Sequence, residues 1–104
     1  MNPETASRLQ SFAINWHTNA KGFIVFSRED CAAFAHHQPA GLSLGSSGVM
    51  TQQGFAYLVW REDRAFLVAH GGAEQPATVE QLDAIRRFSA DLKSALGASV
   101  AGAC

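Results

Sequence analysis

The run QGFAYLVWREDRAFLVAHGG at positions 53–72 constrains the fold more than any other part of the sequence. Its polar centre at 61–64 predicts a hairpin, and the side chains of a strand alternate between two faces. An antiparallel hairpin with one face in water alternates apolar with polar residues, but here both faces are apolar. Each face therefore needs cover, from the protein's own helices or from a partner. The two sets are Phe55, Tyr57, Val59, Phe66, Val68 and His70 on one face, and Ala56, Leu58, Trp60, Ala65, Leu67 and Ala69 on the other.

We expect the chain to form a single small interaction domain spanning 1–104. A chain of this length buries roughly two thirds of its unfolded surface, which is enough for a core. Charged residues make up 16% of the chain and the net charge is −1, so neither a nucleic acid nor an anionic membrane is favoured as a partner. Residues 1–10 lack the features of a signal peptide, and no run approaches the ~18 apolar residues of a spanning helix. We expect a cytoplasmic protein.

Capping signals and apolar spacing predict three helices. Asn2 and Pro3 favour a helix over 3–20, whose apolar stripe recurs at spacings of three and four before Gly22. Ser27 predicts the start of a short helix that ends near His37. Thr78 and Gln81 form a capping box for a last helix that stops at Gly97. Residues 98–104 are expected to fray.

The strands predicted between these helices are GFIVFS at 22–27, a strand at 48–52 and the two strands of the hairpin, with a loop over 40–47. The expected fold is therefore α+β: a small antiparallel sheet of about four strands packed with three helices, in the order α-β-α-β-β-β-α. Three helices, one of them short, cover two sheet faces only in part. We expect an uncovered apolar patch, which usually marks a protein contact.

Candidate catalytic groups are weak in this sequence. GLSLG at 41–45 matches a nucleophile pattern around Ser43, but it lacks the strand before and the helix after. Cys31, expected in the first turns of a helix, fits a buried contact with Phe26 better than a reactive thiol. The histidines lack metal-ligand spacing, and Cys31 and Cys104 are too few for a disulfide framework. We expect no catalytic residue, metal or cofactor.

Aromatic residues are the remaining candidates for function, because they are enriched among binding hot spots. Trp60 ends a strand beside charged residues, where one side of its ring can stay exposed, and the neighbouring arginines could help to select a partner. The residues predicted to bind a partner are Leu9, Phe12 and Trp16 on the first helix and Trp60, Arg61 and Arg64 at the hairpin end.

The chain as a whole, with its opening MNPETASRLQSFAINWH, its length and its near-neutral charge, resembles the small quorum-sensing antiactivators of the QslA type. The resemblance implies a protein without enzymatic activity that binds the ligand-binding domain of a LuxR-type, LasR-like transcription regulator. It further implies that this contact blocks dimerisation of the regulator and so keeps it off DNA. No binding residue is carried over, because the resemblance rests on no diagnostic motif.

Two alternatives stay open beside this hypothesis. The chain could be a homodimeric accessory interaction domain of another complex, because an uncovered apolar patch tends to pair with its own copy. It could also be a thiol enzyme or redox sensor that uses Cys31, with a histidine as its base. A homodimer is expected under the antiactivator hypothesis as well.

Overall fold

The computed structural model describes residues 3–39, 41–52, 54–69 and 71–97. It is a mostly antiparallel sheet of eight strands with two helices, so the expected four strands and three helices are wrong. The elements in chain order are α1 (Pro3–Ser11), β1 (Asn15–Thr18), β2 (Ile24–Arg28), β3 (Cys31–Gln38), β4 (Gly41–Leu44), β5 (Gly48–Thr51), β6 (Gly54–Arg61), β7 (Arg64–Ala69), β8 (Glu74–Pro76) and α2 (Val79–Leu96).

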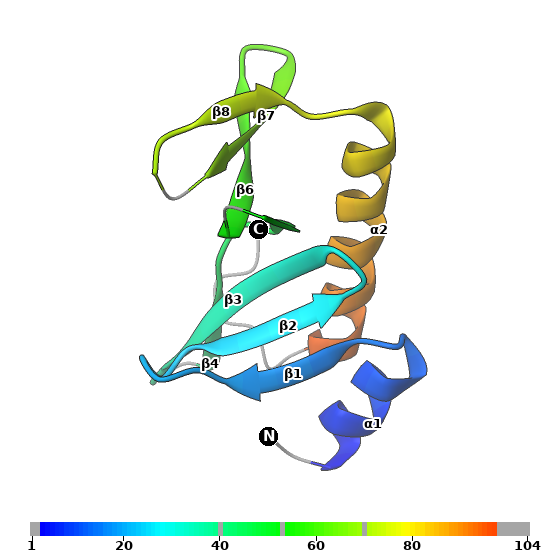
Figure 1. Cartoon of the computed structure of the whole chain (residues 1–104). Coiled ribbons are helices and arrows are strands. Elements are labelled where there is room, and N and C mark those ends of the chain that lie inside the picture. The colour runs from blue at the N-terminus through cyan, green and yellow to red at the C-terminus, as the bar shows by residue number, and fades with distance from the viewer. Residues whose placement is uncertain (1–2, 40, 53, 70, 98–104) are drawn as a thin grey trace.

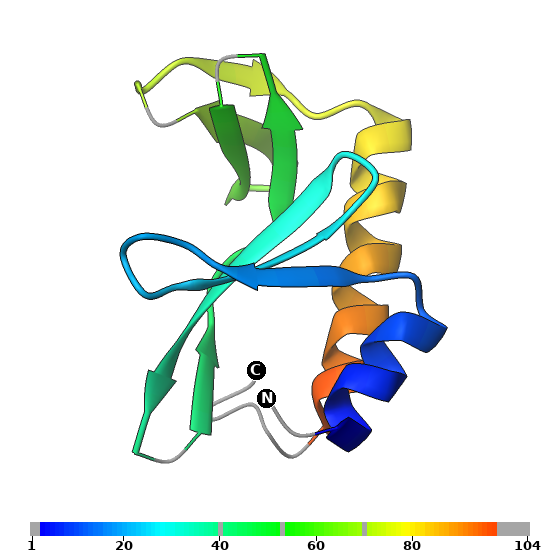
Figure 2. The same cartoon turned by 60° about the horizontal axis from the view of Figure 1, so that its bottom comes forward.

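The sheet is a long meander that divides at β3. The strand order is β1-β2-β3-β5-β6-β7-β8, with β4 paired to β3 off this path. β5 pairs with the beginning of β3 and β4 pairs with its end. Figures 1 and 2 show that β1–β3 and β6–β8 diverge into two arms, and that α2 runs along both. One helix therefore joins the two halves of the sheet.

The core lies between α2 and the face of the sheet that we call the inner face. Ile85, Phe88 and Leu92 repeat at helical spacing along α2 and are buried there. Leu9 of α1 joins the same core, so both helices lie on the inner side. The sheet residues of this core include Ile24, Phe26, Cys31, Ala33, Ala35, Leu42, Val49, Ala56 and Leu67.

The last helix and the hairpin match their predictions. The Thr78 side chain accepts a hydrogen bond from the Gln81 amide at 3.0 Å, and the Gln81 side chain accepts one from the Thr78 amide at 2.9 Å. The helix ends at Gly97, as predicted. β6 and β7 pair across the turn at Glu62 and Asp63 in the register that puts Tyr57 opposite Val68 and Leu58 opposite Leu67. His70, assigned to one hairpin face, lies outside the described residues, as do residues 98–104.

The first helix is shorter than predicted. It ends at Ser11, and Ala13 adopts a positive φ of 59° that does not continue a helix. Residues 15–18 instead form β1, where Trp16 lies opposite Phe26. Spacing suggested a helical stripe through Trp16, but the pairing with β2 decides its structure, because packing across strands overrides weak local propensity.

The second predicted helix is a strand. Glu29, with a φ of 55°, and Asp30 turn the chain between β2 and β3, so the expected contact of Phe26 with Cys31 across a helix start is wrong. The alanines that favoured a helix, Ala33 and Ala35, are fully buried on the inner face. Their small side chains suit a strand that lies close beneath α2. The expected loop at 40–47 also contains a strand, β4.

The opposite side of the sheet, here called the outer face, carries no helix among the described residues. Its apolar side chains alternate with those of the core, as the registers require. They are Phe23, Val25, Phe34, Met50, Phe55, Tyr57, Val59, Phe66 and Val68. The uncovered apolar patch, which the sequence predicted on the sheet or on one helix without naming a face, lies on this face of the sheet.

Candidate functional site

The outer face exposes large apolar side chains at its centre. Phe23 is 36% exposed, Met50 48% and Tyr57 40%. Each comes from a different strand or strand end, so the exposure belongs to the face and not to one frayed element. Large exposed apolar surfaces on a small domain mark contact sites.

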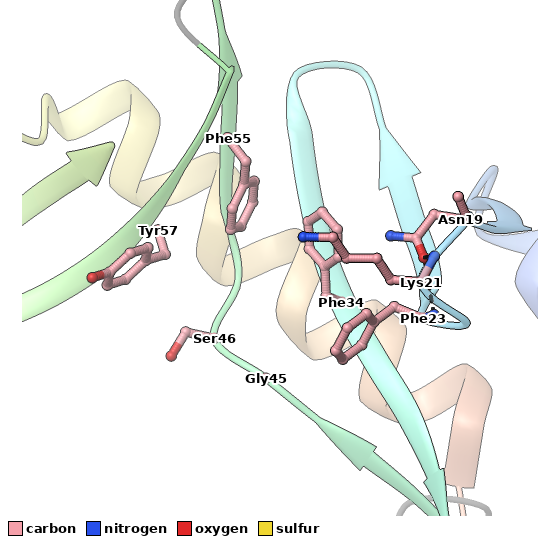
Figure 3. A pocket seen from close by; sticks show the side chains of 9 residues that line it. Asn19, Lys21, Phe23, Phe34, Gly45, Ser46, Phe55 and Tyr57 are labelled. Atoms are coloured by element: carbon pink, nitrogen blue, oxygen red, sulfur yellow. Dashed lines mark hydrogen bonds between the residues drawn. The ribbon is translucent and has the colours of Figure 1, made fainter. Parts of the chain in front are cut away.

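A cleft of ≈ 790 Å³ lies in this face, and we call it the aromatic cleft. The turn between β1 and β2 forms one wall, and β6 with the segment after β4 forms the other (Figure 3). Its nine lining residues are Asn19, Ala20, Lys21, Phe23, Phe34, Gly45, Ser46, Phe55 and Tyr57. The cleft is therefore built by described residues from four segments that the bend of the sheet brings together: the β1–β2 turn, β3, the segment after β4, and β6.

Two rings form the floor of the cleft. Phe34 of β3 and Phe55 of β6 meet edge to face, with ring centroids 5.0 Å apart and planes at 62°. This geometry is the one that aromatic quadrupoles favour. The Gly45 amide donates to the Phe34 carbonyl at 2.8 Å, which turns the chain out of β4 beside this pair. The division of the sheet at β3 thus creates the cleft.

The wall at the β1–β2 turn is held by Asn19. Its Oδ1 accepts hydrogen bonds from the amides of Lys21 and Phe23, each at 3.0 Å. Gly22 supplies the positive φ of 85° that this turn needs. Phe23 also packs edge to face on His36, with centroids 5.8 Å apart. The turn is therefore ordered by its own side chain, and it presents Lys21 and Phe23 to the cleft.

The polar side chains that line the cleft can all donate hydrogen bonds. Lys21 is the one charged residue among the nine that line it, and Figure 3 shows its side chain reaching across the cleft. None of these nine residues carries a carboxylate. The two backbone donors on Asn19 Oδ1 fix the orientation of the amide, so Nδ2 is directed away from the turn. The cleft combines an aromatic floor with a positive, donor-rich rim.

The partner-binding residues predicted on the first helix are not on this face. Leu9 is fully buried in the core, so its side chain does not lie on the surface of this fold. Phe12 and Trp16 are partly buried and pack against the same core. The prediction placed them on one apolar stripe of a helix over 3–20, but the helix ends before Ala13 and both rings pack against the core.

The residues predicted to bind a partner at the hairpin end do not line the aromatic cleft either. Trp60 is 49% exposed and lines a second cleft of ≈ 460 Å³ against α2, with Ile85 and Arg86 among its neighbours. Arg61 pairs with Glu74 and lies 5.8 Å over the ring of Phe66. Arg64 is exposed. Because α1 and the hairpin end lie at opposite ends of the molecule, the structure does not bring the two predicted groups together (Figure 1).

Cys31 does not have the environment of a nucleophile. It opens a strand and not a helix, and its side chain is buried in the core. Burial raises the pKa of its thiol, which the positive charge of Arg28 offsets in part and the negative charges of Asp30 and Glu29 reinforce. A raised pKa lowers the thiolate fraction at neutral pH.

The remaining chemical candidates are also dispersed. Ser43 lies within β4 and not on a turn between a strand and a helix. His17, His36 and His37 are exposed on β1 and β3, and the described residues contain no group of three histidine, cysteine or carboxylate side chains that could hold a metal. The described helices include none that is long and apolar enough to cross a membrane.

The sequence interpretation missed Phe23, Phe34, Met50 and the Asn19 turn. The sequence does contain a signal for Phe23. It is the first aromatic residue of GFIVFS, a segment that is apolar on both faces. Phe34 was assigned to a helix, which hid its relation to Phe55. Comparison with known proteins adds no assignment: no family model, no curated protein and no solved structure matches the chain.

Proposed function

We propose that the protein is a binding domain without enzymatic activity, which docks a protein partner through the outer face of its sheet. The observation that carries the proposal is the exposure of Phe23, Met50 and Tyr57 around an aromatic cleft, on a face that no helix of the described ranges covers. An apolar centre with aromatic anchors and a pocket is the arrangement in which binding energy concentrates at protein interfaces.

The partner that we propose is the ligand-binding domain of a LuxR-type transcription regulator, and the activity that of an antiactivator. A regulator that reads a two-fold DNA site needs two recognition helices at a fixed spacing. A domain that covers the regulator's dimer surface removes this spacing without touching DNA. The net charge of −1 supports such a mechanism, because contact with DNA would need a basic surface. The proposal places the protein in the cytoplasm, where a transcription regulator acts.

Size-exclusion chromatography with light scattering tests the proposal on the protein alone and mixed with a LuxR-type ligand-binding domain. The expected result is a mixed peak whose mass contains one regulator chain, where the regulator alone is a dimer. Met50→Lys and Tyr57→Lys should abolish the mixed peak, because each puts a charge at the centre of the face. Val79→Lys is the matched control, since Val79 is 81% exposed at the start of α2, away from this face.

Two unchanged peaks at micromolar concentration would contradict the antiactivator proposal. The second candidate occupant of the outer face is a second copy of the chain, which the same exposed residues favour. An isologous dimer would bury the same patch on both chains. In that case the protein alone would have twice its chain mass, and the Met50→Lys variant would be a monomer.

A further inference from the structure

We propose that the aromatic cleft is a binding site for a free amphipathic anion, a small molecule with an apolar body and a single anionic head group. This inference goes beyond the docking proposal and does not need a protein partner. The cleft volume of ≈ 790 Å³ lies within the range of about 300–1,000 Å³ that small-ligand sites occupy.

The floor of the cleft suits the apolar body. Phe23, Phe34, Phe55 and Tyr57 contribute four aromatic rings, and Figure 3 shows these side chains arranged around the opening. The edge-to-face contact of Phe34 with Phe55 holds two of these rings together. Aromatic walls with a few placed polar groups are typical of sites that bind small molecules.

The rim of the cleft suits an anionic head group. Lys21 supplies a positive charge, and it forms no ion pair with another described residue. Asn19 Nδ2 lies on the same wall and adds donors, and none of the nine described lining residues is a carboxylate that would repel an anion. Hydrogen bonds to a charged group are the stronger ones, so a head group that accepts them gains affinity over a neutral one.

The site is organised before a ligand arrives. Two backbone amides hold Asn19 Oδ1, which leaves the two protons of Nδ2 for an acceptor in the cleft. The same turn fixes the backbone of Lys21 and Phe23, and a preorganised site loses less entropy on binding. A free molecule is the expected source of the ligand and not a membrane lipid, because membrane surfaces attract clusters of four to eight basic residues and the cleft has one.

The test uses two fluorescent probes with the same aromatic body. 8-Anilinonaphthalene-1-sulfonate carries one anionic group, and N-phenyl-1-naphthylamine carries none. In titrations of the folded protein, the sulfonate should bind at one site per chain and roughly tenfold more tightly than the neutral probe. Lys21→Met should reduce the affinity for the sulfonate by about tenfold and leave the neutral probe unchanged. The side-chain amide NMR signals of Asn19 should shift with the sulfonate alone.

Three controls separate this site from general apolar binding. Arg64→Met removes an exposed cation far from the cleft and should change neither affinity. Phe23→Ala removes a ring that lines the cleft and is 36% exposed, so it should weaken both probes, with an unchanged melting temperature showing that the fold persists. Met50→Lys lies outside the cleft lining, so it should abolish partner docking and keep the probe site. The two proposals can therefore fail separately.

Equal affinity for the two probes, or a sulfonate affinity that Lys21→Met does not change, would overturn the proposal. Binding of the protein to phosphatidylglycerol vesicles without saturable binding of the free sulfonate would overturn it as well, because the ligand would then be a membrane surface. Sulfonate binding that Phe23→Ala does not weaken would place the probe elsewhere on the molecule, with the same consequence.

Discussion

The rings of Phe34 and Phe55 meet edge to face with their centroids 5.0 Å apart, although β5 lies between their strands in the sheet order. The contact spans the place where the sheet divides, and it forms the floor of the aromatic cleft. The shape of the outer face therefore depends on one aromatic pair. This dependence makes the pair the first target for mutation.

A double-mutant cycle of Phe34→Leu and Phe55→Leu should give a coupling free energy of about 0.5–1.5 kcal/mol, which is typical of an aromatic pair beyond its buried area. Urea unfolding of the four proteins measures it. The control cycle pairs Phe34→Leu with Phe66→Leu, whose strands are three positions apart in the sheet order, and should give a coupling near zero. Equal couplings in the two cycles would show that the ring contact has no special role.

Asp91 should matter more for stability than Asp83, although both pair with an arginine. Asp91 Oδ2 accepts a hydrogen bond from Arg28 Nη1 at 2.8 Å, and the same nitrogen donates to the Phe12 carbonyl at 3.0 Å, which ties α2 to β2 and to the end of α1. Asp91→Asn should lower the free energy of unfolding by about 1–3 kcal/mol. Asp83 forms an exposed pair one helical turn from Arg87, so Asp83→Asn should cost only about 0.3–0.5 kcal/mol. Equal losses in urea unfolding would contradict this assignment.

Gly48→Ala should be strongly destabilising. A Cβ at this position would lie 2.0 Å from the Ala56 carbonyl oxygen, because β5 and β6 approach closely there. The backbone must move to accept the methyl group, and we expect a loss of about 3 kcal/mol or more in thermal or urea unfolding. Gly71→Ala is the control, since its Cβ would meet nothing within 4 Å, and it should change stability by less than about 0.5 kcal/mol. A Gly48→Ala protein as stable as the control would show that the two strands are farther apart.

Cys31 should be unreactive in the folded protein. In a Cys104→Ser background, iodoacetamide should modify Cys31 slowly at neutral pH and rapidly only in denaturant, because burial raises the pKa of its thiol. Rapid alkylation of the folded protein below pH 7 would restore the thiol enzyme hypothesis.

The same raised pKa predicts a pH dependence of stability. The unfolded thiol loses its proton from about pH 9, while the folded thiol keeps it to a higher pH. The folded state therefore binds more protons in this window, and the free energy of unfolding should fall as pH rises above about 9. Cys31→Ala in the same background lacks this contribution. The free energy of unfolding of the protein with Cys31 should therefore fall relative to that of the Cys31→Ala variant as pH rises, and a constant difference from pH 8 to 11 would contradict this.

Local signals predicted the parts of the fold that are locally determined. The capping box of Thr78 and Gln81, the stop at Gly97 and the hairpin turn after Arg61 need only neighbouring residues, and all three are confirmed. The segments at 15–18 and 31–38 read as helix, because alanine and spacing favour it, yet they are strands that pair with β2. Their structure depends on pairing with β2 and on packing of the inner face against α2, which the spacing of residues within one segment does not reveal.

The candidate site was predictable only in outline. Two apolar faces on the hairpin indicated an uncovered apolar patch, but the residue predicted to be exposed there was Trp60, and Tyr57 on the opposite face is the one that lines the aromatic cleft. The cleft itself needs the bend that brings Phe34 to Phe55 and the turn that presents Lys21. Because Phe34 was placed on a helix, no pattern in the sequence could join these residues.

The most direct test of the outer face as the docking surface is NMR mapping of the ¹⁵N-labelled protein as a LuxR-type ligand-binding domain is added. The account predicts that the amide signals of Phe23, Phe34, Met50 and Tyr57 shift or broaden together, while those around Val79 stay unchanged. Changes confined to Trp60, Arg61 and Arg64, with the outer face unaffected, would contradict the account and return the contact to the end of the hairpin.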